Sequence, residues 1–279
     1  MHLISYVSVA LAVLGLSAAS PKSCATKRSP EPKFENGQYV VDRAVKFANK
    51  KVWTFTGKTL PEGLYASDYP VGKTHVYKSS GVTLRNGYLE LTVKGGQKAK
   101  PYKCAEIATE VDNIKYASVR TVAILSEPAG VCNGEFIQPI WTDMNANVVQ
   151  GMFFYESDSQ ETDIEWLSDP KSDSNGGTRK LWFTNQDNNG DGKPSHNAVA
   201  PPANPTTTEH EYRIDWTAGL VQFYVDGVKI WQTKKDVPNV PGPWIWNNWS
   251  NGDKGWSAGP PLKDAVFKIK KIEMYYNTA

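Results

Sequence analysis

Apolar and polar residues alternate along most of the chain after Tyr39, in short runs separated by turn-forming residues. A period of two is typical of a strand with one buried face. No long amphipathic helix is visible, although a short helix around residues 42–49 fits the pattern. The expected strands cover residues 51–55, 82–84, 88–93, 105–109, 121–125, 152–155, 162–167, 180–184, 210–216, 221–225, 229–231 and 266–276.

The connections between these runs favour a compact all-β fold. Asn86-Gly87 and Asp226-Gly227 each separate two runs, and both dipeptides suit the positive φ angles of a type I′ hairpin. With 18 Pro and 22 Gly in 279 residues, the sequence predicts a two-sheet antiparallel β-sandwich of the jelly-roll kind. We expect a single domain at residues 34–279.

The first part of the chain has a different composition. Residues 1–19 carry an apolar run followed by small residues, which predicts a signal peptide and a protein that is secreted to the extracellular space or cell wall. The alternative is a membrane anchor, but the run is shorter than the roughly 18–20 residues needed to span. Residues 20–33 read as a linker or pro-segment, in which Lys27-Arg28 is either a processing site or part of a solvated linker.

Charge and cysteine content limit the partners and cross-links. The 31 Lys and Arg residues against 29 Asp and Glu residues leave a net charge of +2, which argues against binding nucleic acid or a membrane surface. The chain has three cysteines, and Cys24 lies in the 20–33 segment. We therefore expect Cys104 and Cys132 to form a disulfide. No metal-ligand spacing links the cysteines to the four histidines, so we expect no metal site of that kind.

Three carboxylates occupy alternate positions in the segment QETDIEWL at residues 160–167. In a strand, Glu161, Asp163 and Glu165 share one face, and Ile164 takes the opposite, core side. Like charges on one face repel, so stability does not explain this row. Without any catalytic role, the three carboxylates would be explained by a solvated charged strand or by a Ca²⁺ site.

The spacing of the two glutamates permits chemistry on a glycosidic bond. Their Cα atoms lie about 13 Å apart in a strand, and side chains that lean together leave the carboxyl groups about 5–6 Å apart. This value is near the roughly 5–5.5 Å of retaining glycosidases. One glutamate could then attack the sugar while the other protonates the departing oxygen, with Asp163 biasing both.

Several motifs in order resemble glycoside hydrolase family 16, especially its secreted fungal members. They are GMFFY at 151–155, ETDIEW at 161–166, HEYRIDW at 210–216, FYVDG at 223–227 and NNW at 247–249. The resemblance implies a concanavalin A-like sandwich with a concave cleft for β-glucan. It implies that Glu161 is the nucleophile, Asp163 the helper and Glu165 the acid/base. It also implies Phe183, Asn247 and Trp249 as substrate-binding residues.

We expect a monomer without a cofactor, and the resemblance alone would allow a structural Ca²⁺. The loop at 187–192 resembles the start of an EF-hand, but Ala198 stands where the last Glu ligand should be, so we interpret it as a turn-rich loop. Asn248-Trp-Ser is a glycosylation sequon that we expect to be sparsely occupied because of its place beside the expected cleft.

One segment departs from the family pattern. Members usually run from a GVCNG stretch directly into an aromatic strand, whereas here residues 135–151 (EFIQPIWTDMNANVVQG) intervene between Gly134 and Met152. Its ends are compatible with an unspliced intron, and we hypothesise that it is a gene-model artefact. The alternative is a genuine insertion beside the substrate.

Taken together, the sequence predicts a retaining endo-β-glucanase acting on β-1,3- or β-1,3-1,4-linked glucan. Lichenases and fungal cell-wall transglycosylases share the single residue between Asp163 and Glu165, so a transglycosylase is one alternative. A lectin-like glucan-binding protein on the same fold is another.

Overall fold

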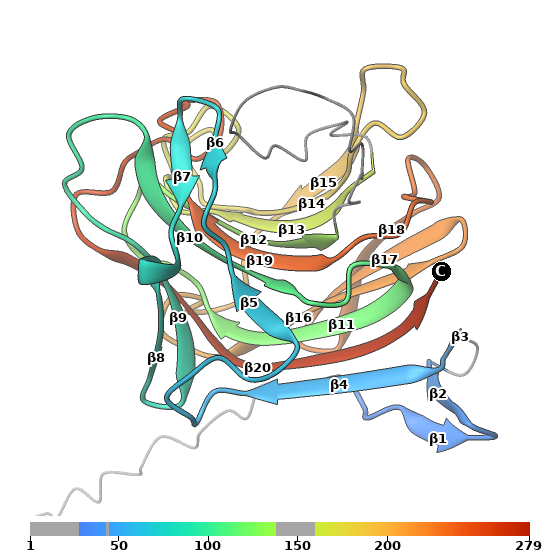
Figure 1. The fold of residues 1–279 in the computed structure, drawn as a ribbon. Helices are drawn as coiled ribbons and strands as arrows, with labels where there is room; N and C mark the ends of the chain where they lie inside the picture. Colours follow the sequence, from blue (N-terminus) through green and yellow to red (C-terminus); the bar gives the residue numbers. More distant parts are fainter. Residues whose placement is uncertain (1–27, 43–44, 138–159) are drawn as a thin grey trace, which may run out of the picture.

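The computed structural model describes residues 28–42, 45–137 and 160–279, and within them it confirms the predicted all-β sandwich. Two large sheets stack face to face, and a small sheet lies at one end (Figure 1). Nearly every pairing is antiparallel; β7 and β10 form a parallel pair. The signal peptide expected at residues 1–19, Cys24, the strand expected at 152–155 and residues 138–151 lie outside the described residues.

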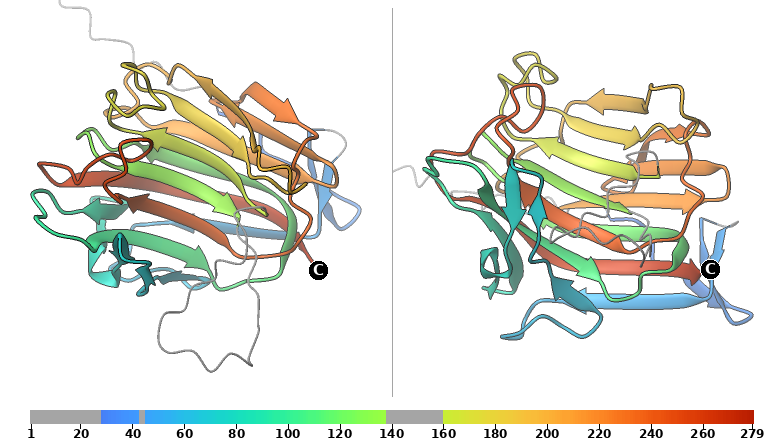
Figure 2. Two further views of the ribbon diagram at one scale, coloured as in Figure 1. Left: turned by 90° about the horizontal axis from the view of Figure 1, so that it is seen from above. Right: turned by 45° about the horizontal axis from the view of Figure 1, so that its top comes forward.

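The first large sheet has nine strands and carries the carboxylate row. Its order is β15-β14-β13-β12-β19-β10-β7-β6, with β5 also paired to β10. The strands are β5 (Leu64–Ala66), β6 (Pro70–Val71), β7 (His75–Tyr77), β10 (Tyr102–Thr109), β12 (Cys132–Ile137), β13 (Thr162–Leu167), β14 (Leu181–Asn185), β15 (Ser195–Val199) and β19 (Trp244–Trp249). Strands that are far apart in sequence, such as β12 and β19, therefore lie side by side (Figure 2).

The second large sheet has eight strands and covers the inner face of the first. Its order is β18-β17-β16-β11-β20-β9-β8, with β4 also paired to β20. The strands are β4 (Asn49–Thr54), β8 (Val82–Arg85), β9 (Tyr88–Val93), β11 (Ile114–Ile124), β16 (His210–Thr217), β17 (Leu220–Val225), β18 (Val228–Thr233) and β20 (Ala265–Thr278). A short 3-10 helix, η1 (Ser79–Gly81), precedes β8.

The N-terminal part forms a small sheet of β1 (Lys33–Glu35), β2 (Gln38–Val41) and β3 (Val45–Phe47). The short helix expected around residues 42–49 is therefore wrong. Burial alternates within β3, and Phe47 is buried in a cluster with Val41 and Tyr275, which favours an extended chain. Just upstream, the Ser29 main-chain N–H donates to the buried Glu211 at 2.9 Å, so the described chain contacts the second sheet before β1 begins.

Both predicted hairpins are confirmed. Asn86 and Gly87 connect β8 to β9 with φ angles of 54° and 76°. Asp226 and Gly227 connect β17 to β18 with φ angles of 50° and 72°. Two successive positive φ values match the right-handed twist of the flanking strands.

The core between the two large sheets is rich in aromatic side chains. Fully buried members include Trp166, Trp216, Trp244 and Trp246, and apolar residues of both sheets complete it. Burying several such large rings accounts for much of the stability of the sandwich.

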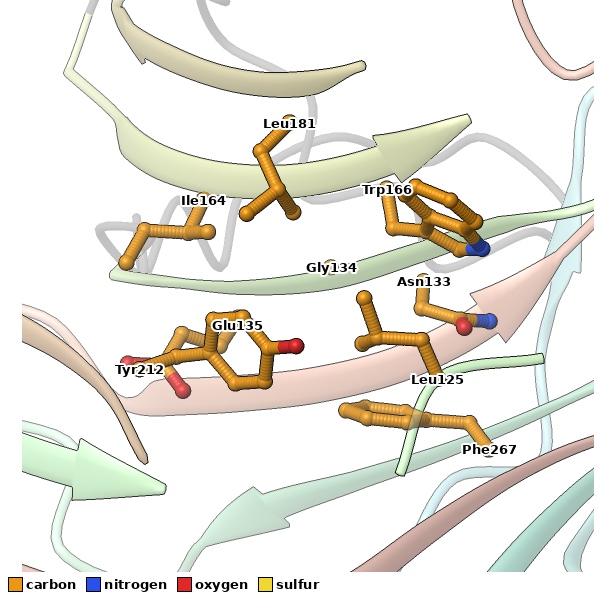
Figure 3. A pocket seen from close by; sticks show the side chains of 9 residues that line it. All are labelled: Leu125, Asn133, Gly134, Glu135, Ile164, Trp166, Leu181, Tyr212 and Phe267. Carbon is orange, nitrogen blue, oxygen red and sulfur yellow. The ribbon is translucent and has the colours of Figure 1, made fainter. Parts of the chain in front are cut away.

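One core position holds a carboxyl group. Glu135 on β12 pairs with Ile164 and Trp246, two core residues, and is 3% exposed. Its Oε1 meets no hydrogen-bond partner within the described chain, and burial raises its pKa to about 8. Figure 3 shows it in a small cavity of the sandwich interior that Leu181 and Tyr212 also line. This cavity lies behind the carboxylate row and not beside it.

No helix among the described residues is long and apolar enough to cross a membrane.

Candidate active site

The carboxylates lie on the face of the nine-stranded sheet that is turned away from the second sheet, here called the open face. On β13, Thr162, Ile164 and Trp166 are buried on the core side, so alternation turns Asp163 and Glu165 to the open face. Glu161 immediately precedes the strand and is half-buried. The parity predicted from the sequence is thus confirmed for β13.

Strand register extends this face across the sheet. Glu165 lies opposite Trp182 on β14 and opposite Gly134 on β12. Gly134 lies opposite Asn247 on β19, which in turn lies opposite Glu106 on β10. Residues that lie opposite each other share a face, so the side chains of this row surround the same surface.

Asp163 is a fully buried carboxyl between two others. Its Oδ2 accepts a hydrogen bond from Gln186 Nε2 at 3.2 Å, and within the described chain its Oδ1 meets no donor. Burial, followed by the charge of Glu161 and a hydrogen bond with it, raises the pKa of Asp163 well above its usual value. This rise favours the protonated form of Asp163, which can donate a hydrogen bond to the Glu161 carboxylate.

Glu165 is half-buried and has two donors on one oxygen. Cys132 Sγ lies 3.1 Å from its Oε1, and the Trp256 indole Nε1 lies 3.2 Å from the same atom. Burial raises the pKa of Glu165, and the two hydrogen bonds offset part of that rise. A carboxyl group with a raised pKa can act as an acid at neutral pH.

Two of the three expected substrate-binding residues belong to the open face. Asn247 lies in the row of Glu165; it is 2% exposed and its Nδ2 donates to the Tyr77 hydroxyl at 3.0 Å. Trp249, two residues along β19, is half-buried, and its ring stacks on His75 with centroids 5.4 Å apart.

Phe183, the third, is placed elsewhere. It pairs with Ile164, is fully buried and packs against Phe223 with ring centroids 5.4 Å apart. This position corrects the expectation that Phe183 contacts substrate. The neighbouring Trp182 has the open-face parity instead; it is half-buried, and its ring centroid lies 5.1 Å from that of Trp256. Trp182 was missed because a shift of one residue exchanges the two faces.

Glu106 is a further residue of this row that the sequence pattern did not indicate. It is 2% exposed, its Oε1 accepts hydrogen bonds from Ser67 Oγ at 2.7 Å and Tyr69 Oη at 2.8 Å, and burial raises its pKa to about 7. Within its own strand it is one polar residue in an apolar run, and only the register of β10 with β19 brings it beside Asn247.

The predicted disulfide is wrong, because Cys104 and Cys132 are both free and buried. β19 lies between their strands: Ala105, next to Cys104, pairs with Asn248, and Cys132 pairs with Trp249. Two strand spacings separate the cysteine Cα atoms by about 9.5 Å. This exceeds the roughly 7 Å that a disulfide spans.

The loop at 187–192 uses its carboxylates to hold its own turns, as interpreted from the sequence. Asp187 accepts hydrogen bonds from the main-chain N–H groups of Asp191 and Gly192. In the described part of the chain, no three His, Cys, Asp or Glu side chains group to hold a metal ion. Asn248 is fully buried and donates to Leu91 O and Ala265 O, so its amide is inaccessible to glycosylation in the folded protein.

The fold resembles that of several β-glucanases. A β-1,3-1,4-glucanase (lichenase) derived from a mouse hindgut metagenome superposes with a TM-score of 0.62 at 16% identity, covering 82% of this chain and 99% of that chain. Bacillus licheniformis β-glucanase gives 0.61 at 16% identity, covering 82% and 98%. The catalytic domain of an endo-1,3-β-glucanase (laminarinase) from Thermotoga petrophila gives 0.61 at 17% identity, also covering 82% and 98%. At these identities the likeness shows the fold.

Sequence similarity gives evidence beyond the fold. A curated β-glucanase of Acetivibrio thermocellus is 28% identical over 183 residues, which are 62% of this chain and 46% of that protein. The chain thus spans about half the length of that relative. The model of the family described as glycosyl hydrolases family 16 matches residues 72–254, a range that contains the whole carboxylate row. The chain therefore belongs to glycosyl hydrolases family 16.

Proposed function

We propose that the protein is a retaining endo-β-glucanase that hydrolyses β-1,3- or β-1,3-1,4-linked glucan. The observation that carries the proposal is the electrostatic order of the row. A buried Asp163, whose pKa is raised well above its usual value, separates the half-buried Glu161 from Glu165, whose pKa is also raised. Two glutamates in unlike environments can divide nucleophilic and acid/base roles.

In the first step, the Glu161 carboxylate attacks the anomeric carbon while Glu165 gives its proton to the departing glycosidic oxygen. Asp163, as donor to Glu161, keeps the attacking oxygen oriented. The C–O bond to the leaving sugar breaks as the glycosyl–Glu161 ester forms. In the second step, Glu165, now ionised, takes a proton from water, and that water releases the sugar from Glu161 with net retention.

The substrate class follows from the surroundings of the row and from the relatives. Trp182 and Trp249 offer flat apolar surfaces on the open face, and Asn247 with Glu106 offers polar groups beside them. This combination suits the apolar faces and hydroxyl edges of sugar rings. The relatives that bear the names lichenase and laminarinase act on β-1,3-1,4- and β-1,3-linked glucans, and we extend that substrate class to this chain.

Product analysis tests the proposal. Purified protein is incubated with barley β-glucan and with laminarin, and the anomeric configuration of the first products is followed by proton NMR. We expect cleavage at internal linkages of the glucan, and we expect the new reducing ends of the oligosaccharides to form first as β-anomers. Initial α-anomers would exclude retention. If the protein releases no product from any β-glucan, hydrolysis is excluded and a glucan-binding role is favoured. Longer products after addition of an acceptor oligosaccharide would indicate the transglycosylase instead, since the acceptor hydroxyl then replaces water.

The cellular setting is part of the proposal. An extracellular polysaccharide substrate agrees with the signal peptide expected at residues 1–19 and with a protein secreted to the medium or cell wall. We propose that it works as a monomer.

Trp182 and Phe183 form a natural pair for testing which face meets substrate. Trp182→Ala is expected to raise KM about five- to tenfold, because a stacking contact of roughly 1–1.5 kcal/mol is lost, with little change in Tm. Phe183→Ala is expected to lower the free energy of unfolding by about 3–5 kcal/mol, because it leaves a cavity in the core. Steady-state kinetics and thermal unfolding of both variants give the comparison. A KM effect confined to Phe183→Ala would contradict it.

A further inference from the structure

We propose that Cys132 is a positioning residue for Glu165, acting together with Trp256. The inference rests on the proposed function, in which Glu165 is the acid/base. Cys132 lies on β12, next to β13, and its thiol is directed at the Glu165 carboxyl. Trp256 reaches the same carboxyl from the loop between β19 and β20.

Both hydrogen bonds that the described residues give to Glu165 end on Oε1, at 3.1 Å from Cys132 Sγ and 3.2 Å from Trp256 Nε1. A carboxyl oxygen has two lone pairs, and two donors occupy both. The acidic proton is then held on Oε2. The two donors also fix the rotation of the carboxyl group, a torsion that is otherwise soft. The pair therefore selects which oxygen presents the proton to the glycosidic bond.

Cys132 suits this role as a neutral thiol. It is fully buried, and burial followed by the charge of Glu165 raises the pKa of its thiol well above the usual value, so it keeps the hydrogen that it donates. A thiol is a neutral donor, so it lowers the pKa of Glu165 by less than a cationic donor would. Glu165 is thereby oriented without losing the raised pKa that an acid needs.

Other ionisable groups near Glu165 bear on its titration. They are Glu161 and Asp163 at its own strand, Cys132 on β12, His196 on β15 beyond Trp182, and Asp253 and Lys254 in the loop of Trp256. β14 carries no ionisable side chain. None of these groups is altered by replacing Cys132 with alanine except the thiol itself, so a shifted titration of Glu165 reports on the thiol.

The chain supplies a matched control. Cys104 is also a free, buried cysteine of the nine-stranded sheet, but its Sγ contacts Tyr102 O at 3.6 Å and the main chain of Ser250. Cys104→Ala and Cys132→Ala remove the same atoms from similar depths. A general effect of lost packing appears in both variants, whereas an effect on Glu165 appears only in the second.

The test is the pH dependence of kcat/KM on whichever β-glucan the protein hydrolyses. Cys132→Ala and Trp256→Phe each remove a donor that favours the ionised form of Glu165, so its pKa rises. We expect the basic limb, where Glu165 loses its proton, to move up by about 0.5–1 pH unit in each variant, with the acidic limb and the Cys104→Ala profile unchanged. Because Trp256 lies in a loop, Trp256→Phe serves if Cys132→Ala does not fold.

A second measurement separates this inference from the proposed function. The Glu165 carboxyl is titrated by ¹³C NMR in protein labelled at glutamate, with its signal assigned by Glu165→Gln, and this readout needs no turnover. An unmoved titration in Cys132→Ala and Trp256→Phe would overturn the positioning role even in an active enzyme. A moved titration in a protein that releases no product from any β-glucan would support the contact and overturn the proposed function.

Discussion

Replacing Glu161 with alanine is expected to lower kcat on β-glucan by roughly a thousandfold or more, equivalent to about 4 kcal/mol of activation free energy. The side chain that forms the covalent intermediate is then absent, and water has to attack directly. Glu161 is half-buried at the entry to β13 and does not belong to the apolar core of the described residues, so we expect the variant to fold. Rates on glucan and thermal unfolding of the same preparation measure the two quantities.

Small anions separate the role of Glu161 from that of Glu165. Azide can enter the space left by the Glu161 carboxylate and attack the anomeric carbon, so azide should restore activity to Glu161→Ala and give an α-glycosyl azide. Glu165→Ala removes the acid, so it should retain the first step on an aryl glycoside whose leaving group needs no proton. If azide gives an α-product with Glu165→Ala and none with Glu161→Ala, the two assignments are exchanged.

Local patterns predicted those parts of the fold that depend on neighbouring residues. Alternation placed Ile164 on the core side and Glu165 on the open face, and two dipeptides predicted hairpins that the structure contains. On β14 the family resemblance, and not alternation, suggested Phe183 for the open face, and an error of one residue exchanges Trp182 for Phe183. Period two identifies two faces, but it does not say which face of an edge-proximal strand meets the core.

Features that depend on register between distant strands could not be obtained this way. Glu106 joins the row of Glu165 only because β19 lies between β10 and β12. The same insertion of β19 keeps Cys104 and Cys132 apart, although counting cysteines suggested a pair. Composition carries no information on which strand separates two others, and this order decides both results.

The buried carboxyl of Glu135 bears on the hypothesis that residues 135–151 derive from an unspliced intron. Glu135 lies in the core beside Ile164 and Trp246, one of its oxygens meets no partner in the described chain, and its pKa rises from the ordinary 4.5 to about 8. A buried acid with an incomplete set of hydrogen bonds is destabilising. A core strand with this residue is therefore a poor match to its surroundings.

Glu135→Met is expected to raise the free energy of unfolding by about 1–4 kcal/mol, because an apolar side chain replaces a poorly compensated buried acid. The pH dependence gives a sharper signature. Between pH 4.5 and about 8 the folded state keeps a proton that the unfolded state has lost, so the stability of the parent protein falls as pH rises through this range. Urea unfolding at several pH values should show a smaller slope in Glu135→Met than in the parent, because the raised pKa values of Glu106, Asp163 and Glu165 contribute to the slope of both proteins. An equal slope in both proteins would place its source elsewhere.

Deleting residues 135–151 extends the same test to the hypothesis itself. Gly134 is then followed by Met152, and the alternation of β12 would give Met152 the core position of Glu135 and Phe154 the next core position. Six residues, 155–160, would then connect Phe154 to Glu161, a length within the usual range of short connections. We expect the deletion variant to be at least as stable as Glu135→Met, to show the same reduced pH slope and to retain hydrolysis. A transcript without the corresponding segment would establish the splice. A transcript that retains the segment, together with a deletion variant that does not fold, would contradict the intron hypothesis. Residues 135–151 would then be a genuine insertion that the folded protein needs, despite the buried carboxyl of Glu135.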